Sequence, residues 1–106
     1  MATSTINQIM NNSGNNYCKM PDGTLIQWGA SPIARNAGIN NVTATFPISF
    51  IDIPFGFVNY PTGHPELWMA SILSATKTTI QCCLYNGGST ISSSAEIWWF
   101  AIGRWK

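Results

Sequence analysis

The sequence predicts an all-β domain, an antiparallel β-sandwich of six to seven strands. Three observations lead to this fold class. From residue 17 onward apolar side chains recur at every second position, stretches of Gly, Pro and Asn separate these runs, and no long segment has helical spacing. A chain of 106 residues has room for one such domain with a modest core.

The N-terminal segment, residues 1–16, has a different composition. It is rich in Ser, Thr and Asn, and its end, residues 11–16, has the composition of a linker. Ile6, Ile9 and Met10 have the spacing of one or two amphipathic helical turns, or belong to a fraying leader. We therefore expect a linker or stalk connector over 1–16, followed by the sandwich domain over 17–106.

The first two strands are expected at Tyr17–Met20 and Thr24–Gly29. The Pro-Asp-Gly sequence between them is typical of a tight hairpin, because Pro presets φ, Asp bonds the backbone and Gly23 accepts a positive φ. The following stretch, Ala30–Asn41, is expected to be a loop whose only charged residue is Arg35.

The middle of the chain alternates clearly between apolar and polar positions. Residues 42–50 have the pattern of a half-buried strand, interrupted at Pro47, and the alternation continues through residues 53–57. A long loop is expected over Tyr60–Trp68, which overlaps the start of the next strand, Leu67–Thr76. Thr78–Tyr85 is the following strand, and the Asn-Gly-Gly sequence closes it.

The last expected strand, Glu96–Trp105, is apolar on both faces. Its odd-numbered face and its even-numbered face both carry large side chains, whereas a strand of a small sandwich normally shows one face to water. A short chain has little material for a third layer, so we favour burial of one face in an oligomer. The expected interface residues are Trp98, Phe100 and Ile102.

Charge is scarce. Only 8% of the residues are charged, the net charge is +1, and about a third of the chain is Ser, Thr, Asn or Gln. These values argue against a nucleic-acid partner and against membrane insertion, and the N-terminus lacks the blocks of a signal peptide. Three cysteines, two of them adjacent, do not form a disulfide framework, so we expect reduced thiols and assembly in a reducing cytoplasm.

The groups that catalysis requires are few. The chain has four carboxylates and one histidine, and no spacing among them selects an acid–base pair or a metal site. Phosphate-binding and dinucleotide-binding glycine motifs are also missing. We expect no enzyme, no cofactor and no metal. An enzyme that cleaves surface polysaccharide, a depolymerase, is the alternative, and it would require turnover that depends on Glu66 or Glu96.

Binding is better supported than catalysis. Exposed rings beside amide and guanidinium groups suit uncharged polar ligands such as sugars, because a ring covers the apolar face of the sugar while the amides bond its hydroxyls. Taken singly, each residue also has a structural explanation, with Trp68 in the core and the asparagines in turns. The expected ligand-binding residues are Arg35, Asn36, Tyr60, His64, Trp68 and Tyr85.

Three segments, residues 21–29 (PDGTLIQWG), 46–50 (FPISF) and 99–103 (WFAIG), resemble the small C-terminal receptor-binding domain of bacteriophage tail fibre proteins. The resemblance spans about residues 17 to 104, and this group is similar in fold to H-type lectins. It implies a homotrimer at the fibre tip that recognises the bacterial surface, commonly a glycan. In this comparison Trp28 and Trp99 pack the sandwich, while Gly23 and Gly103 serve turns or strand ends.

The function expected from these observations is attachment without catalysis. The chain would belong to the virion tail, with the rest of the tail fibre, its own copies in a trimer and bacterial surface carbohydrate as partners. Two alternatives remain at this point, a structural oligomerisation or capping module of a tail assembly and a cellular H-type lectin. No binding residue is implied by the resemblance itself, because the ligand-binding loops are where such domains differ most.

Overall fold

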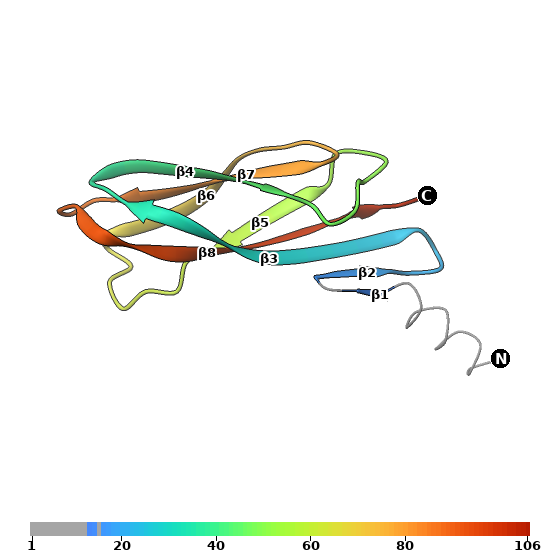
Figure 1. The fold of residues 1–106 in the computed structure, drawn as a ribbon, viewed down its shortest axis with the longest axis horizontal. Helices are drawn as coiled ribbons and strands as arrows, with labels where there is room; N and C mark the ends of the chain where they lie inside the picture. Colours follow the sequence, from blue (N-terminus) through green and yellow to red (C-terminus); the bar gives the residue numbers. More distant parts are fainter. Residues whose placement is uncertain (1–12, 15) are drawn as a thin grey trace.

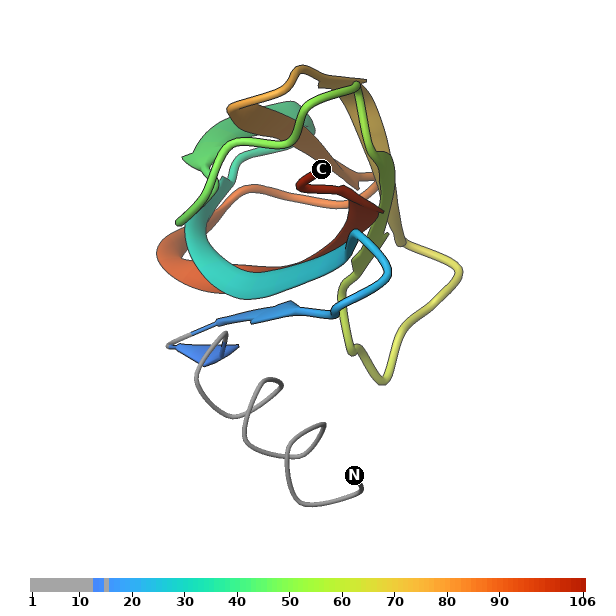
Figure 2. The ribbon, with the colours of Figure 1, turned by 90° about the vertical axis from the view of Figure 1, so that its right-hand side faces the viewer.

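Two antiparallel β-sheets form the fold, as Figure 1 shows from the side and Figure 2 end-on. The computed structural model describes residues 13, 14 and 16–106, which form eight strands and no helix, hence no helix able to span a membrane. The predicted fold class is confirmed. The strands are β1 (Ser13–Gly14), β2 (Tyr17–Lys19), β3 (Thr24–Arg35), β4 (Gly38–Thr45), β5 (Phe55–Asn59), β6 (Trp68–Ala75), β7 (Thr79–Asn86) and β8 (Ile91–Arg104).

The larger sheet has the order β1-β2-β3-β8-β5 and the smaller one the order β4-β7-β6. Most of the expected connector, residues 1–16, lies outside the described residues, including the expected helical turn. Its described part contributes β1, which pairs with β2 and was not expected as a strand. This short strand is the reason that the sandwich has eight strands instead of six or seven.

The expected loop over Ala30–Asn41 was wrong. In the structure β3 continues to Arg35 and a two-residue turn leads into β4. Pro32 is accommodated because β2 pairs with β3 only as far as Gln27, so this part of β3 is unpaired on that side. Pairing with β3 also starts β8 earlier than expected, at Ile91. The segment 46–50, expected as strand, lies after the end of β4.

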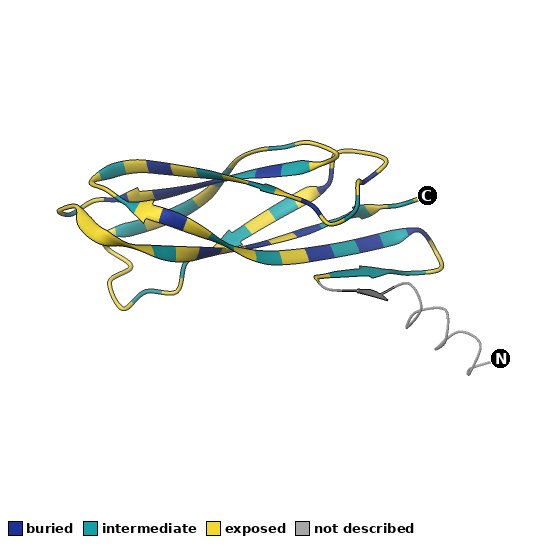
Figure 3. Ribbon diagram, viewed as in Figure 1, coloured by how far each residue is buried: buried dark blue, intermediate teal, exposed yellow. Residues whose placement is uncertain are grey.

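The core lies between the inner faces of the two sheets, and the alternation of buried and exposed residues along each strand is visible in Figure 3. On β8 the buried face consists of Ile97, Trp99 and Ala101, so the period of two along this strand places one set of side chains inward. The core residues are Leu25, Ile33, Phe46, Phe50, Ile80, Cys82, Leu84, Ile97, Trp99 and Ala101.

The segment 46–50 closes one end of the core. Gln27, fully buried, donates from Nε2 to the carbonyl oxygen of Ile48 (2.7 Å) and accepts from its N–H (2.9 Å). This pair of hydrogen bonds holds Phe46 and Phe50 over the core, with their ring centroids 5.0 Å apart and their planes at 87°. Phe46 also packs edge-on against Trp99, with centroids 5.5 Å apart.

Glycines allow the other close contacts between the three segments 21–29, 46–50 and 99–103. A Cβ at Gly29 would come within 2.5 Å of the Trp99 ring, and one at Gly103 within 2.8 Å of the Phe50 ring. Gly23 has φ of 101° in the predicted β2–β3 hairpin turn. The three segments therefore form one connected structural unit.

The two ends of the sandwich differ in what they carry (Figure 1). One end consists of the β3–β4, β5–β6 and β7–β8 connections, residues 36–37, 60–67 and 87–90, and is called the loop end below. The other end carries the β2–β3 turn, the β6–β7 turn and the C-terminus. There the Trp105 N–H donates to the Gly23 carbonyl (2.9 Å) and the Trp105 ring N–H to that of Met20 (2.9 Å).

Candidate functional site

Asn86, the last residue of β7, links the end of β3 to the β7–β8 turn. Its buried side chain donates from Nδ2 to the carbonyl oxygens of Arg35 (3.1 Å) and Ser89 (2.9 Å), and its Oδ1 accepts from the Gly88 N–H (2.8 Å). The amide of the residue that follows Asn86 donates to the carbonyl of Leu67 (2.7 Å). The Asn86 side chain thus fixes the end of β3 relative to the β7–β8 turn, and the neighbouring Gly87 amide adds the end of the β5–β6 loop.

Asn40 does the same for the β3–β4 turn. It is buried on the inner face of β4, and its amide accepts from the Asn36 N–H (3.1 Å) and donates to the Asn36 carbonyl (2.8 Å). It also donates to the carbonyl of Leu84 on β7 (3.3 Å). The Asn40 side chain therefore fixes the backbone of Asn36, while the side chain of Asn36 is exposed to solvent.

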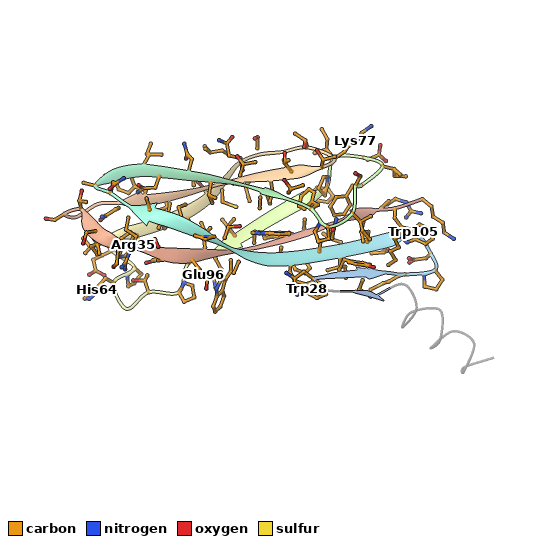
Figure 4. The ribbon with its side chains drawn as sticks, in the orientation of Figure 1. Trp28, Arg35, His64, Lys77, Glu96 and Trp105 are labelled. Carbon is orange, nitrogen blue, oxygen red and sulfur yellow. The ribbon has the colours of Figure 1, made fainter. Side chains whose placement is uncertain are left out.

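Arg35 lies at the end of β3 and spans toward β8. Its Nε donates to the carbonyl oxygen of Ser93 (2.9 Å), and its Nη2 donates to the hydroxyl of the same residue. The guanidinium is half-buried and fixed in place, with donors left over for a ligand. Arg35 and His64 lie at the same end of the molecule, as Figure 4 shows.

Two aromatic rings in contact flank the β5–β6 loop at its beginning and its end. Tyr60 and Trp68 have centroids 5.2 Å apart with planes at 44°, and both rings pack against the core. Between them the loop is exposed, and His64 Nδ1 lies 3.3 Å from an oxygen of Glu66. Both side chains of this pair are mostly exposed, so solvent screens the contact and it contributes little to stability.

The loop end therefore brings together Arg35, Asn36, Tyr60, His64 and Trp68, five of the six expected ligand-binding residues. The sixth, Tyr85, lies nearby on the outer face of β7, between Ile39 of β4 and Met69 of β6. The three side chains form an exposed row across the smaller sheet. The supporting roles of Asn40 and Asn86 are not visible in the sequence, because both depend on carbonyl groups from other strands.

The outer side of the larger sheet carries an aromatic face, defined here as Trp28, Phe55, Phe57, Trp98 and Phe100. The register places Trp28 opposite Phe100 on β8, and Phe100 opposite Phe57 on β5. Phe55 is 77% exposed and Trp98 51%. Trp28, expected to pack the sandwich, points outward in the single chain, because its neighbour Gln27 takes the inward position.

A shallow hollow of about 470 Å³ lies on the aromatic face, between the Trp28 and Trp98 rings. Its other lining residues are Asn16, Gly29, Ala30 and Trp99. Two of the expected interface residues, Trp98 and Phe100, are on the aromatic face, and the third, Ile102, is half-buried at its border, opposite Phe55. The face and the loop end occupy different parts of the molecule.

The described part of the chain assembles no group of three His, Cys, Asp or Glu side chains suited to a metal ion. Asp22 lies in a turn, where the backbone N–H of Thr24 donates to its carboxylate (2.9 Å) and lowers its pKa. Burial raises the pKa of Cys82 to about 11, so this thiol is protonated at neutral pH. The loop end offers hydrogen-bonding groups and rings to a ligand.

The chain matches known tail fibre proteins in sequence and in structure. Residues 19–104 match the family model of the tail fiber protein gp53-like, C-terminal. No curated protein sequence matches the chain.

Solved structures of pyocin fibres have the same fold. The C-terminal part of the R2 pyocin fibre of P. aeruginosa is 26% identical with a TM-score of 0.66, over 83% of this chain and 23% of that one. An N-truncated R2-type pyocin tail fibre is 26% identical with a TM-score of 0.65, over 83% and 34%. An N-truncated R1-type pyocin tail fibre is 22% identical with a TM-score of 0.65, over 97% and 96%, and shows the fold alone.

The chain thus spans about a quarter of the solved C-terminal part of the R2 pyocin fibre that it matches. The family match covers most of the chain, from the β2–β3 hairpin to the end of β8, and includes the three segments that form the connected unit. The chain belongs to the family of gp53-like tail fibre C-terminal domains.

Proposed function

We propose that this domain is the receptor-binding part of a tail fibre, which works as a homotrimer and attaches to carbohydrate on the bacterial surface without cleaving it. The observation that carries the proposal is the loop end. Two buried asparagines and the Gly87 amide hold three connections there. These connections present rings, a guanidinium and exposed amides, which suit hydrogen bonding to an uncharged polar ligand.

The position of the loop end supports this assignment. The chain enters the fold through β1 and β2, and β2 pairs with Leu25–Gln27, in the half of β3 remote from the loop end. If residues 1–16 connect the domain to the rest of the fibre, the stalk joins the sandwich away from the loop end. The loops would then face the host cell.

The aromatic face supports the trimer. Five large exposed rings on one sheet exceed what a soluble monomer normally shows to water, and such a face is typical of a subunit interface. Light scattering of the full chain is expected to return about three times its mass of 11.6 kDa. A mass near 11.6 kDa would contradict the trimer.

Receptor binding is tested with purified full chain on host cells and on an array of bacterial surface polysaccharides. We expect saturable binding that Arg35→Ala and Trp68→Ala weaken, with no release of reducing ends. A structural capping module, the alternative, would show no binding at micromolar concentration. It would also leave the two variants equal to wild type in adsorption.

A further inference from the structure

The smaller sheet has an outer surface without charge. None of the residues of β4, β6 or β7 is charged, although this side of the sheet faces outward. Exposed sheet surfaces and exposed edge strands normally carry charged side chains, which keep them soluble and prevent pairing with other chains. We call this surface the uncharged face, defined by the outward side chains of β4, β6 and β7.

A flat apolar row crosses the uncharged face next to the loop end. Ile39 is 68% exposed, Met69 67% and Tyr85, between them, 45%. The Tyr85 ring lies against Gly87, where a Cβ would be 3.3 Å from the ring, so the β7–β8 turn supports the ring from one side. The row is an aromatic platform with an aliphatic side chain on either flank.

The next outward row supplies hydrogen-bonding groups. Asn41 of β4 and Ser71 of β6 lie opposite Cys83, which is buried between them. Both Asn41 and Ser71 are exposed, and neither side chain has a hydrogen-bond partner within the described residues. Alternate residues on a strand are about 7 Å apart, a separation comparable with the width of a sugar ring and its hydroxyl groups.

This arrangement suits one class of ligand. A ring platform beside an unpaired amide and an unpaired hydroxyl fits a neutral sugar. The apolar face of the sugar stacks on the ring, and its hydroxyls form hydrogen bonds with the amide and the hydroxyl. A charged ligand would find no charged partner on this face. A second copy would require a larger continuous apolar area, which the structure offers on the aromatic face of the other sheet.

We propose that the Ile39–Tyr85–Met69 row, with Asn41 and Ser71, is a binding subsite for a neutral saccharide residue. The inference rests on the proposed function. It adds which surface binds the carbohydrate and that the bound saccharide is uncharged. Because this subsite and the aromatic face belong to the outer sides of different sheets, a trimer closed through the aromatic face leaves the subsite accessible.

The test uses full chain and an array of purified bacterial surface polysaccharides, both neutral and acidic. Tyr85→Ala is expected to weaken binding to a neutral polysaccharide about tenfold, and Asn41→Ala severalfold. Tyr85→Phe keeps the ring and should stay within about threefold of wild type. Thr45→Ala is the matched control, because Thr45 is exposed on the same strand at the far end of the face.

Three results would overturn the subsite and leave receptor binding intact. The first is binding that is lost in Arg35→Ala or Trp68→Ala but unchanged in Tyr85→Ala and Asn41→Ala. The second is binding to acidic polysaccharides alone. The third is a changed mass of Tyr85→Ala in light scattering, which would assign the uncharged face to a second copy. Wild-type chain that binds no polysaccharide at micromolar concentration would overturn the subsite together with the proposed ligand class.

Discussion

Replacement of Gln27 by leucine tests the reasoning about how the three family segments are held together. The side chain is fully buried, and its amide satisfies both backbone groups of Ile48, at 2.7 and 2.9 Å. Leucine has a similar volume and is more apolar, so a hydropathy argument alone expects equal or greater stability. The structure leads to the opposite expectation, because the substitution leaves one N–H and one carbonyl without partners.

The magnitude follows from these two groups. A buried polar group that loses its partner costs about 1 to 3 kcal/mol, and the better transfer of leucine into the core offsets part of the sum. We therefore expect Gln27→Leu to lower the free energy of unfolding by about 2 to 4 kcal/mol. That is a large part of the roughly 5 to 15 kcal/mol of an ordinary domain.

Urea unfolding followed by tryptophan fluorescence measures this change. All variants are compared at a single protein concentration, because the proposed trimer would make stability depend on concentration. Gln81→Leu is the matched control, since Gln81 is partly exposed and has only a long side-chain contact to Ser74 (3.4 Å). It should change stability by less than about 0.5 kcal/mol. Equal midpoints for the two variants would refute the role assigned to the Gln27 amide.

Three further predictions concern the loop end and the core. Asn86→Asp replaces the two N–H donors that face backbone carbonyls with a carboxylate oxygen, which the carbonyls repel, so binding to host cells should be lost. Unchanged binding would contradict the role of Asn86 in holding the loop end. Gly29→Ala places a Cβ 2.5 Å from the Trp99 ring and should cost about 1 to 3 kcal/mol in urea unfolding, whereas Gly63→Ala, with open space around it, should cost little. Cys82 has its pKa raised to about 11 in the folded state from an ordinary value of 9.0, so its contribution to stability is present below pH 9 and is lost as the pH rises toward 11. Cys82→Ala should flatten that part of the stability profile.

The strands of this domain could be predicted because their signal is local. On β8 the side chains at 97, 99 and 101 are buried and those at 98 and 100 are exposed, as the period of two requires. The hairpin at Gly23 follows from the backbone preferences of three consecutive residues. The hairpin between β3 and β4 was missed, since residues 30–41 were expected to form a loop. Only the pairing of strands decides which side of Pro32 needs a donor.

The candidate site was predictable only in part. Rings, amides and a guanidinium in the connections indicated a binding surface, and the fold gathers five of the six expected residues at one end. The buried asparagines that hold this end were missed, since Asn40 and Asn86 bond to carbonyls of residues as far away as Leu84 and Arg35. No local pattern distinguishes such an asparagine from one that merely forms a turn.

The sequence by itself determined the all-β class, the inward and outward sides of β8 and the scarcity of charge, which argues against a nucleic-acid partner. Tertiary structure alone decided which of two neighbours, Gln27 or Trp28, points into the core. Hydropathy places the tryptophan inside, yet the glutamine is buried and the tryptophan lies on the aromatic face. The reason is that burial of an amide costs little once the backbone of a distant segment satisfies it, and that segment is brought there by the fold.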